Sequence, residues 1–165
     1  MTDQTGERGV GVDRAGEHWV VVTLGDDVGD DGIEATTESH IADVWGEHGG
    51  EGARIAVDVP IGLPNDALFQ EGDAEKDADG EWARPCDDAA RDAVGGDRAP
   101  SVFNAPAREV LELLPDSEDD GDAKVEHSDL TERNQKVTGK GLSAQSVGIL
   151  EAIEEVDSFL LEKQE

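Results

Sequence analysis

Cysteine is nearly absent from this chain of 165 residues, which contains only Cys86. A single cysteine cannot form an intramolecular disulfide, and this suits a reducing cytosol. Long apolar runs are also lacking: no stretch approaches the roughly 18 residues needed to span a bilayer, and the N-terminal MTDQTGERG has no apolar signal core. We therefore expect a cytoplasmic protein with no membrane partner.

Positively charged residues are scarce as well. The chain has 13 Lys and Arg against 41 Asp and Glu, a formal charge of −28. This balance argues against a basic groove that binds nucleic acid by releasing counterions. The acids are spread between regular apolar runs, which favours a folded domain with a carboxylate-coated surface over an acidic disordered chain. The length of the chain is enough for one domain, which we expect to cover residues 1–165. Concentrated salt would screen the repulsion between its surface carboxylates, so we expect the chain to come from an extreme halophile of archaeal type.

The apolar pattern predicts an α/β fold. Strands are expected at Gly9–Ala15, Trp19–Leu24, Ile33–Thr37 and Arg54–Val59. A tight turn at Gly16 is expected to join the first two, and the first three can form an antiparallel meander. The fourth, apolar apart from Arg54 at its start and Asp58, would return parallel through a helix as a central buried strand. Ser39 is the expected cap of that helix, whose common face carries Ile41, Val44, Trp45 and His48. Gly49-Gly50 is expected to end it.

The second half of the chain is expected to alternate between helices and acidic loops. Pro85 and Pro106 mark helix starts, and Gly95-Gly96 is expected to end the first of these two helices. Ser143 caps the longest helix, whose apolar positions run to Leu160. Residues 68–82 and 115–129 are rich in Asp, Glu and Gly and are expected to be loops.

Two aspartates end apolar runs: Asp13 in GVDRAG and Asp58 in RIAVDVP. An ionised carboxylate at the end of a buried strand is costly unless something compensates its charge, and a divalent cation is one usual compensation. On neighbouring strands the two carboxylates would lie about 5 Å apart and could share Mg²⁺ or Mn²⁺. Alternatively, each aspartate bonds the backbone amides of the following turn.

A few cationic groups are candidates for binding an anionic substrate. Lys140 lies in the glycine-rich TGKGLS that precedes a helix, where backbone amides could also hold an anion, although the segment lacks Walker A spacing. Arginine offers a fork to phosphate or carboxylate, and the chain has arginines at positions 84, 91, 98 and 108. Structural ion pairs are the alternative for most of them. The histidines show no zinc-binding spacing.

Several short segments, taken in order, resemble the DUF429 family, which is described as predicted nucleases with a ribonuclease H-like fold. They are GVDRAGEHWVVV, RIAVDVPIGLP, RPCDDAAR, APSVFNAPAREVL and TGKGLSAQSVGILEAIEEVD. The resemblance runs from Gly9 to about Asp157. It implies a mixed sheet with three antiparallel and two parallel strands, flanked by helices, and it makes Asp13 and Asp58 the catalytic, metal-binding acids.

The family pattern continues beyond the EVD segment with another strand, which carries His-Pro-Glu, and further helices. The sequence given stops at Glu165, so we expect a member that lacks its C-terminal part. A helix acid such as Glu47 is then a candidate for a further ligand. The fourth strand would become an apolar sheet edge, and such edges invite self-association.

Three functions remain open. The first is metal-dependent hydrolysis of nucleic acid or another phosphoester by Asp13 and Asp58, with Arg84, Arg108 and Lys140 as substrate contacts. The second is phosphotransfer of the actin-like sugar-kinase type, which needs a second strand–Asp–x–x–Gly–strand hairpin that this sequence lacks. The third is a non-catalytic binding domain or an inactive, truncated family member.

Overall fold

The computed structural model describes residues 8–25, 32–50, 53–65, 75–76, 82–115 and 125–163. They divide into two compact units. The first unit comprises residues 1–59 and 155–165, and the second comprises residues 60–154. Among the helices in the described ranges, none has the length and apolar character needed to cross a bilayer.

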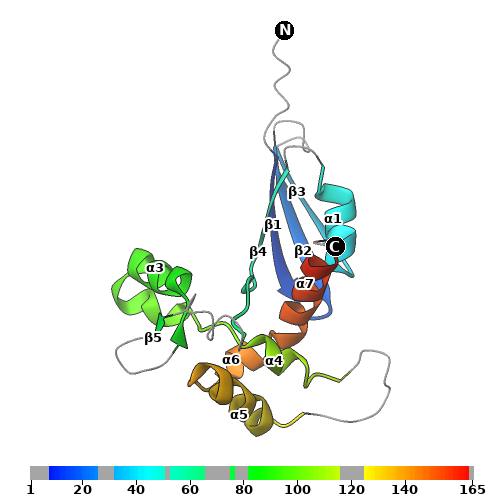
Figure 1. Cartoon of the computed structure of the whole chain (residues 1–165). Helices are drawn as coiled ribbons and strands as arrows, with labels where there is room; N and C mark the ends of the chain where they lie inside the picture. The colour runs from blue at the N-terminus through cyan, green and yellow to red at the C-terminus, as the bar shows by residue number, and fades with distance from the viewer. Residues whose placement is uncertain are drawn as a thin grey trace. The chain divides into compact units, whose positions relative to one another are not determined.

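A four-stranded mixed sheet forms the centre of the first unit (Figure 1). Its strands are β1 (Arg8–Ala15), β2 (His18–Leu24), β3 (Ile33–Glu38) and β4 (Ala53–Val57), in the order β3-β2-β1-β4. The β1–β2 and β2–β3 pairs are antiparallel, and β4 pairs parallel with β1. The expected α/β fold, with three antiparallel strands and one parallel strand flanked by helices, is confirmed, and it is compatible with a ribonuclease H-like arrangement.

Helices cover one face of this sheet. Helix α1 (Ile41–His48) and the C-terminal part of α7 (Leu150–Glu162) lie on the same side of it (Figure 1). Alternate strand residues point to this side because successive side chains of a strand face opposite ways. They are buried there together with helix residues; the buried apolar set includes Val10, Val12, Trp19, Val21, Ile41, Val44 and Val156.

The first helix begins differently from the prediction. Ser39 is not its cap: the N-cap position is His40, which makes no side-chain capping bond. Instead, the Ile41 amide donates to Glu155 Oε1 over 2.6 Å. A carboxylate from a distant helix therefore accepts a hydrogen bond from the first turn of α1, a role that local sequence cannot reveal. Gly49 ends the helix, as predicted.

The fourth strand lies at a sheet edge. Within the described sheet, β4 has β1 as its only neighbour. Its residues alternate between half-buried and exposed, whereas the apolar sequence had suggested a central strand buried on both faces. That expectation is wrong because apolar character does not distinguish a two-sided core strand from an edge strand. The edge position agrees with the alternative expectation for a shortened sheet.

The second unit is mainly helical. It contains β5 (Glu75–Lys76) paired with β6 (Trp82–Ala83), α3 (Pro85–Val94), the 3-10 helix η1 (Gly96–Ser101), α4 (Arg108–Leu111), α5 (His127–Thr138) and α6 (Ala144–Val147). Pro85 starts α3 and Gly95 ends it, as predicted. Residues 68–74, 77–81 and 116–124, from the two expected loops, lie outside the described residues. The expected loop at 68–82 also contains β5 and the first residue of β6, so that part of the expectation is wrong.

Two helical predictions need correction. The expected loop to residue 129 ends earlier, because α5 begins at His127. Its buried face carries Asn134 and Thr138 beside Leu130 and Val137, so apolar spacing alone did not reveal it. The expected single helix after Ser143 is divided into α6 and α7. The Ser143 cap itself is confirmed, since its hydroxyl accepts from the Ser146 amide over 3.0 Å.

Candidate functional site

Asp13 and Asp58 lie side by side at one end of the β1–β4 ladder. The parallel register pairs Gly11 with Ala56 and Val12 with Val57, and the Asp58 amide donates to the Val12 carbonyl over 2.9 Å. Continuing this register by one residue sets Asp13 beside Asp58. Adjacent strands are about 4.8 Å apart, and residues in register share a face, so the two side chains project to the same side.

That side is the open face of the sheet in the first unit. Both aspartates are exposed, whereas Val12 faces the covered side and is 3% exposed. Both carboxylates border an open hollow of about 600 Å³. The residues around it are Gly11, Val12, Asp13, Val20, Val22, Ala56, Val57 and Asp58. The acids therefore sit at an accessible, otherwise apolar surface.

The charges of Asp13 and Asp58 are uncompensated within the described part of the chain. Neither carboxylate has an ion pair or a side-chain hydrogen bond there, and the hollow contains no Lys or Arg. The neighbouring Arg14 points to the covered face, where its Nη1 contacts Glu155 Oε2 at 3.0 Å. The alternative in which each aspartate bonds the backbone amides of the next turn has no support among the described residues. The role of both acids as metal ligands stays a prediction.

Arg84, a predicted substrate contact, is held by local partners in the second unit. Its Nη2 and Nε donate to the Asp87 carboxylate over 2.6 and 2.9 Å, and its Nη1 donates to the carbonyls of Ile61 and Gly62. Burial disfavours the charged guanidinium, but the hydrogen bond and charge of Asp87 outweigh it and raise the pKa of Arg84. An anion at Arg84 would have to compete with Asp87.

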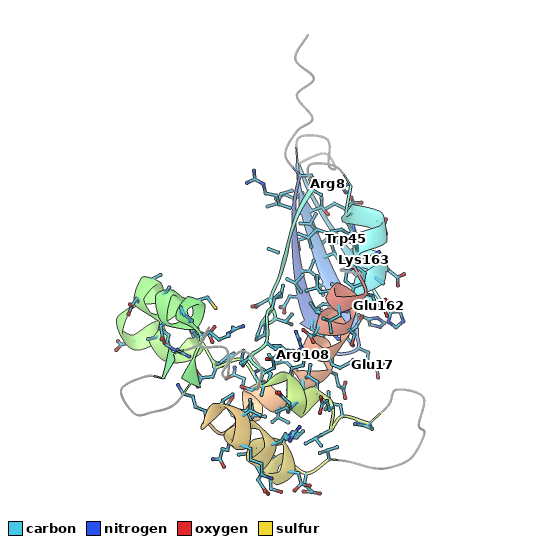
Figure 2. All side chains as sticks on the ribbon, viewed as in Figure 1. Arg8, Glu17, Trp45, Arg108, Glu162 and Lys163 are labelled. Atoms are coloured by element: carbon cyan, nitrogen blue, oxygen red, sulfur yellow. The ribbon has the colours of Figure 1, made fainter. Side chains whose placement is uncertain are left out.

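Arg108 and Lys140 also belong to the second unit. Arg108 is half-buried at the start of α4, and its amide donates to the Pro64 carbonyl over 2.9 Å (Figure 2). Lys140 borders a polar hollow of about 480 Å³ together with Arg91 and Ser143. These features agree with an anion-binding role for Lys140, and both substrate assignments stay predictions.

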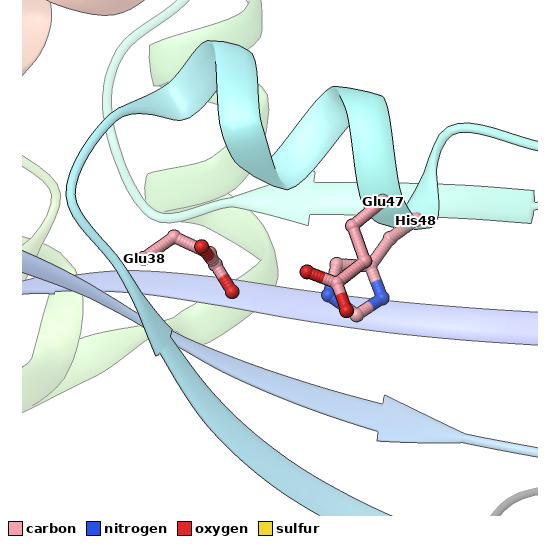
Figure 3. A group of neighbouring side chains, drawn as sticks. All are labelled: Glu38, Glu47 and His48. Atoms are coloured by element: carbon pink, nitrogen blue, oxygen red, sulfur yellow. The ribbon is translucent and has the colours of Figure 1, made fainter.

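A group that the sequence did not single out as a site occurs on the covered side of the sheet (Figure 3). Glu38 ends β3, and Glu47 and His48 end α1. Each offers one ligand atom, and these atoms lie within 4.8 Å of one another. Carboxylate oxygen and imidazole nitrogen are common metal ligands, so this group could hold a metal ion. Glu47 thus lies on the face opposite Asp13 and cannot join the aspartate pair.

Sequence spacing missed this group for a physical reason. Glu38 is nine residues before Glu47, and the intervening turn folds α1 back along the strand (Figure 3). This separation is not one of the short ligand spacings that indicate a metal site in sequence. The sequence predicts His48 on the core face of the helix, and it is buried there. One weak signal for this group exists in the sequence: residues that can bind metal stand both at the end of the strand and at the end of the following helix.

The fold and these sites can now be compared with known proteins. The profile of a family described as a protein of unknown function, DUF429, matches residues 11–165. The chain belongs to the DUF429 family. No match was found among curated proteins or among solved structures. The family resemblance is therefore confirmed, and its description assigns no activity to DUF429 members.

Proposed function

We propose that this DUF429 chain is a metal-dependent phosphodiesterase or nuclease, with Asp13 and Asp58 as the ligands of Mg²⁺ or Mn²⁺. The observation that carries the proposal is the parallel register, which leaves two carboxylates adjacent on an open face with no described cation beside them. Hard oxygen ligands, a small number of carboxylates and room for water and phosphate suit Mg²⁺ and Mn²⁺.

The two aspartates would supply the negative charge that binds the ion, and the strands would hold their carboxylates in fixed positions around it. A bound divalent ion would neutralise phosphate oxygens and make a water molecule a better nucleophile. Arg84, Arg108 and Lys140 belong to the second unit, and we propose them, within that unit, as contacts for an anionic ligand, which the net charge of −28 would otherwise repel.

Calorimetric titration with Mn²⁺ tests this function, together with cleavage of labelled DNA and RNA oligonucleotides. The titrations are made in a Glu47→Gln background, because Glu38, Glu47 and His48 could also hold a metal. Asp58→Asn is expected to weaken Mn²⁺ binding by about tenfold or more, since carboxylate charge sets the affinity of such sites, and to abolish cleavage.

Asp43→Asn is the matched control, because Asp43 is an exposed aspartate in the first turn of α1. It should bind Mn²⁺ and cleave like its parent. Equal binding heats for Asp58→Asn and Asp43→Asn, or no binding heat in either, would contradict the proposal that Asp13 and Asp58 bind a catalytic metal ion.

We also propose that the protein works in a cytoplasm of high ionic strength, of the haloarchaeal type. Support comes from the 41 acids against 13 Lys and Arg and from the spread of these acids along the chain. At about 1 M salt the Debye length is roughly 3 Å, so repulsion between surface carboxylates is strongly screened.

The alternative is a non-catalytic binding domain or an inactive family member. One observation favours it: the open face of the described sheet is largely apolar and ends at the edge strand β4, whose outer backbone groups have no strand partner in that sheet. Such an edge can pair with another strand, including one from a second copy of the chain.

A further inference from the structure

We propose that Glu38, Glu47 and His48 form a second metal site, distinct from the aspartate pair, which binds a divalent transition metal such as Zn²⁺ and links β3 to α1. The site lies on the helix-covered side of the sheet, away from the open face, and its three protein ligands leave a fourth position of a tetrahedral ion for water.

The strongest observation is the state of the His48 side chain. His48 is only 4% exposed, and its Nε2 is buried without a hydrogen-bond partner among the described residues. Leaving a buried polar atom unpaired is unfavourable, and native proteins pair nearly all such atoms. Figure 3 shows the imidazole beside the carboxylate of Glu47, with the Glu38 carboxylate facing both from the end of β3.

The carboxylates of Glu38 and Glu47 also lack a described partner. Within the described ranges, neither Glu38 nor Glu47 forms an ion pair or a side-chain hydrogen bond. The Glu38 and Glu47 carboxylates repel each other at this short distance. A metal ion between them would replace this repulsion with two attractive contacts, one to each carboxylate. Tetrahedral Zn²⁺ separates its ligand atoms by about 3.4 Å, so from 4.8 Å the side chains need to close by at most about 1.4 Å.

The donor set selects the class of metal. One imidazole nitrogen with two carboxylates favours Zn²⁺, Co²⁺ or Mn²⁺ over Mg²⁺, which prefers oxygen ligands alone. Affinity should rise from Mn²⁺ to Co²⁺, following the general order for divalent first-row metals. Asp13 and Asp58 offer only oxygen, so the two sites should differ in their metal preference.

Arg8 constrains which nitrogen of the His48 ring carries the hydrogen. Its Nη2 lies 3.5 Å from His48 Nδ1, and Figure 2 labels Arg8 at the start of β1. A guanidinium can only donate, so Nδ1 accepts and the ring hydrogen is on Nε2. Metal binding through Nε2 needs the hydrogen on Nδ1 instead. Arg8 therefore opposes metal binding, and its contact with His48 must open when the metal enters.

Zn²⁺ titration of the Asp58→Asn protein in molar KCl tests the site, because this background disables the proposed aspartate site. We expect one bound Zn²⁺ and no heat with Mg²⁺ at the same concentration. Adding Glu47→Gln should weaken Zn²⁺ binding by about tenfold or more. Glu47 is exposed, so this variant should fold. Adding Glu34→Gln, an exposed glutamate on the same strand as Glu38, should leave the affinity unchanged.

Arg8→Gln gives the sharper test. The amide oxygen of glutamine can accept a hydrogen bond from Nδ1–H, so we expect Zn²⁺ to bind about tenfold more tightly. Arg54→Gln removes the same charge from the neighbouring strand and should change the affinity much less.

At the same concentration, Zn²⁺ should also raise the thermal unfolding midpoint of Glu34→Gln more than that of Glu47→Gln, because a ligand that binds only the folded state stabilises it according to its affinity. Equal Zn²⁺ affinities in these two variants, or no Zn²⁺ binding in either, would overturn the proposal. Loss of this site would leave the Mn²⁺ test of Asp13 and Asp58 unaffected, since that test is made without Glu47.

Discussion

At the scale of single residues, Glu155 connects three elements of the first unit. Its carboxylate accepts hydrogen bonds from Trp19 Nε1 on β2, over 3.1 Å, and from the Ile41 amide at the start of α1. It also pairs with Arg14 of β1 at 3.0 Å, and the Arg14 guanidinium lies 5.0 Å from the Trp19 ring centroid. Because Trp19 is fully buried, removing this acceptor would leave an indole N–H with no access to water.

We predict that Glu155→Ala lowers the free energy of unfolding by about 1–3 kcal/mol, the usual cost of leaving buried donors unpaired. Guanidinium denaturation followed by tryptophan fluorescence, at fixed KCl, measures it. Glu151→Gln is the control: this exposed acid of the same helix should change stability by less than about 0.5 kcal/mol. Equal midpoints for the two variants would show that Glu155 does not hold the sheet to its helices.

At the scale of elements, the two edges of the sheet differ in chemistry. Edge strand β3 carries Glu34 and Glu38, whereas Arg54 is the only charged residue in β4. Charged side chains on an edge oppose pairing with a second chain. The parallel register turns the backbone groups of Ile55 and Val57 away from β1. The edge formed by β4 is therefore the more open to strand addition.

We predict that the wild-type chain self-associates through β4 in molar KCl, where charge repulsion is screened. Ala56→Lys places a charge on an exposed position of this strand and should shift the mass from light scattering toward the monomer. Ala42→Lys adds the same charge to an exposed position of α1 and should not. A wild-type protein that stays monomeric at all concentrations contradicts this prediction.

At the scale of the whole molecule, the charge of −28 dominates the response to salt. The Debye length falls from about 10 Å at 0.1 M to about 3 Å at 1 M salt, so long-range repulsion among the carboxylates becomes weak. The unfolded chain spreads the same charges further apart, so low salt favours unfolding over the compact state.

We therefore predict that the denaturation midpoint rises steeply between about 0.1 M and about 2 M KCl. Urea unfolding measures this without adding ionic strength. Sucrose in place of KCl serves as the control, since it favours compact states by exclusion but does not screen charge. A midpoint that is the same at both KCl concentrations would contradict the view that surface repulsion limits stability.

Much of the first unit followed from sequence, because its signals are local. Alternation along residues 9–24 and the turn at Gly16 predicted the β1–β2 hairpin, and Gly49 and Gly95 marked the ends of α1 and α3. Several failures came from polar residues in structural roles, whereas the wrong expectation for β4 came from its apolar character. Asn134 is buried in α5, where it accepts from the Ala107 amide and donates to the Lys140 carbonyl. Such a residue looks like a loop residue in sequence.

By itself, the sequence determined the strands, their α/β order and the end-of-strand positions of Asp13 and Asp58, because alternation and turn residues act over a few neighbours. Only the tertiary structure decided which side each acid faces. Parallel register brings Asp13 to Asp58, and the fold of α1 along β3 brings Glu38 to His48. These meetings depend on chain segments far apart in sequence, whose pairing is selected by burial of the whole sheet face and not by any local preference.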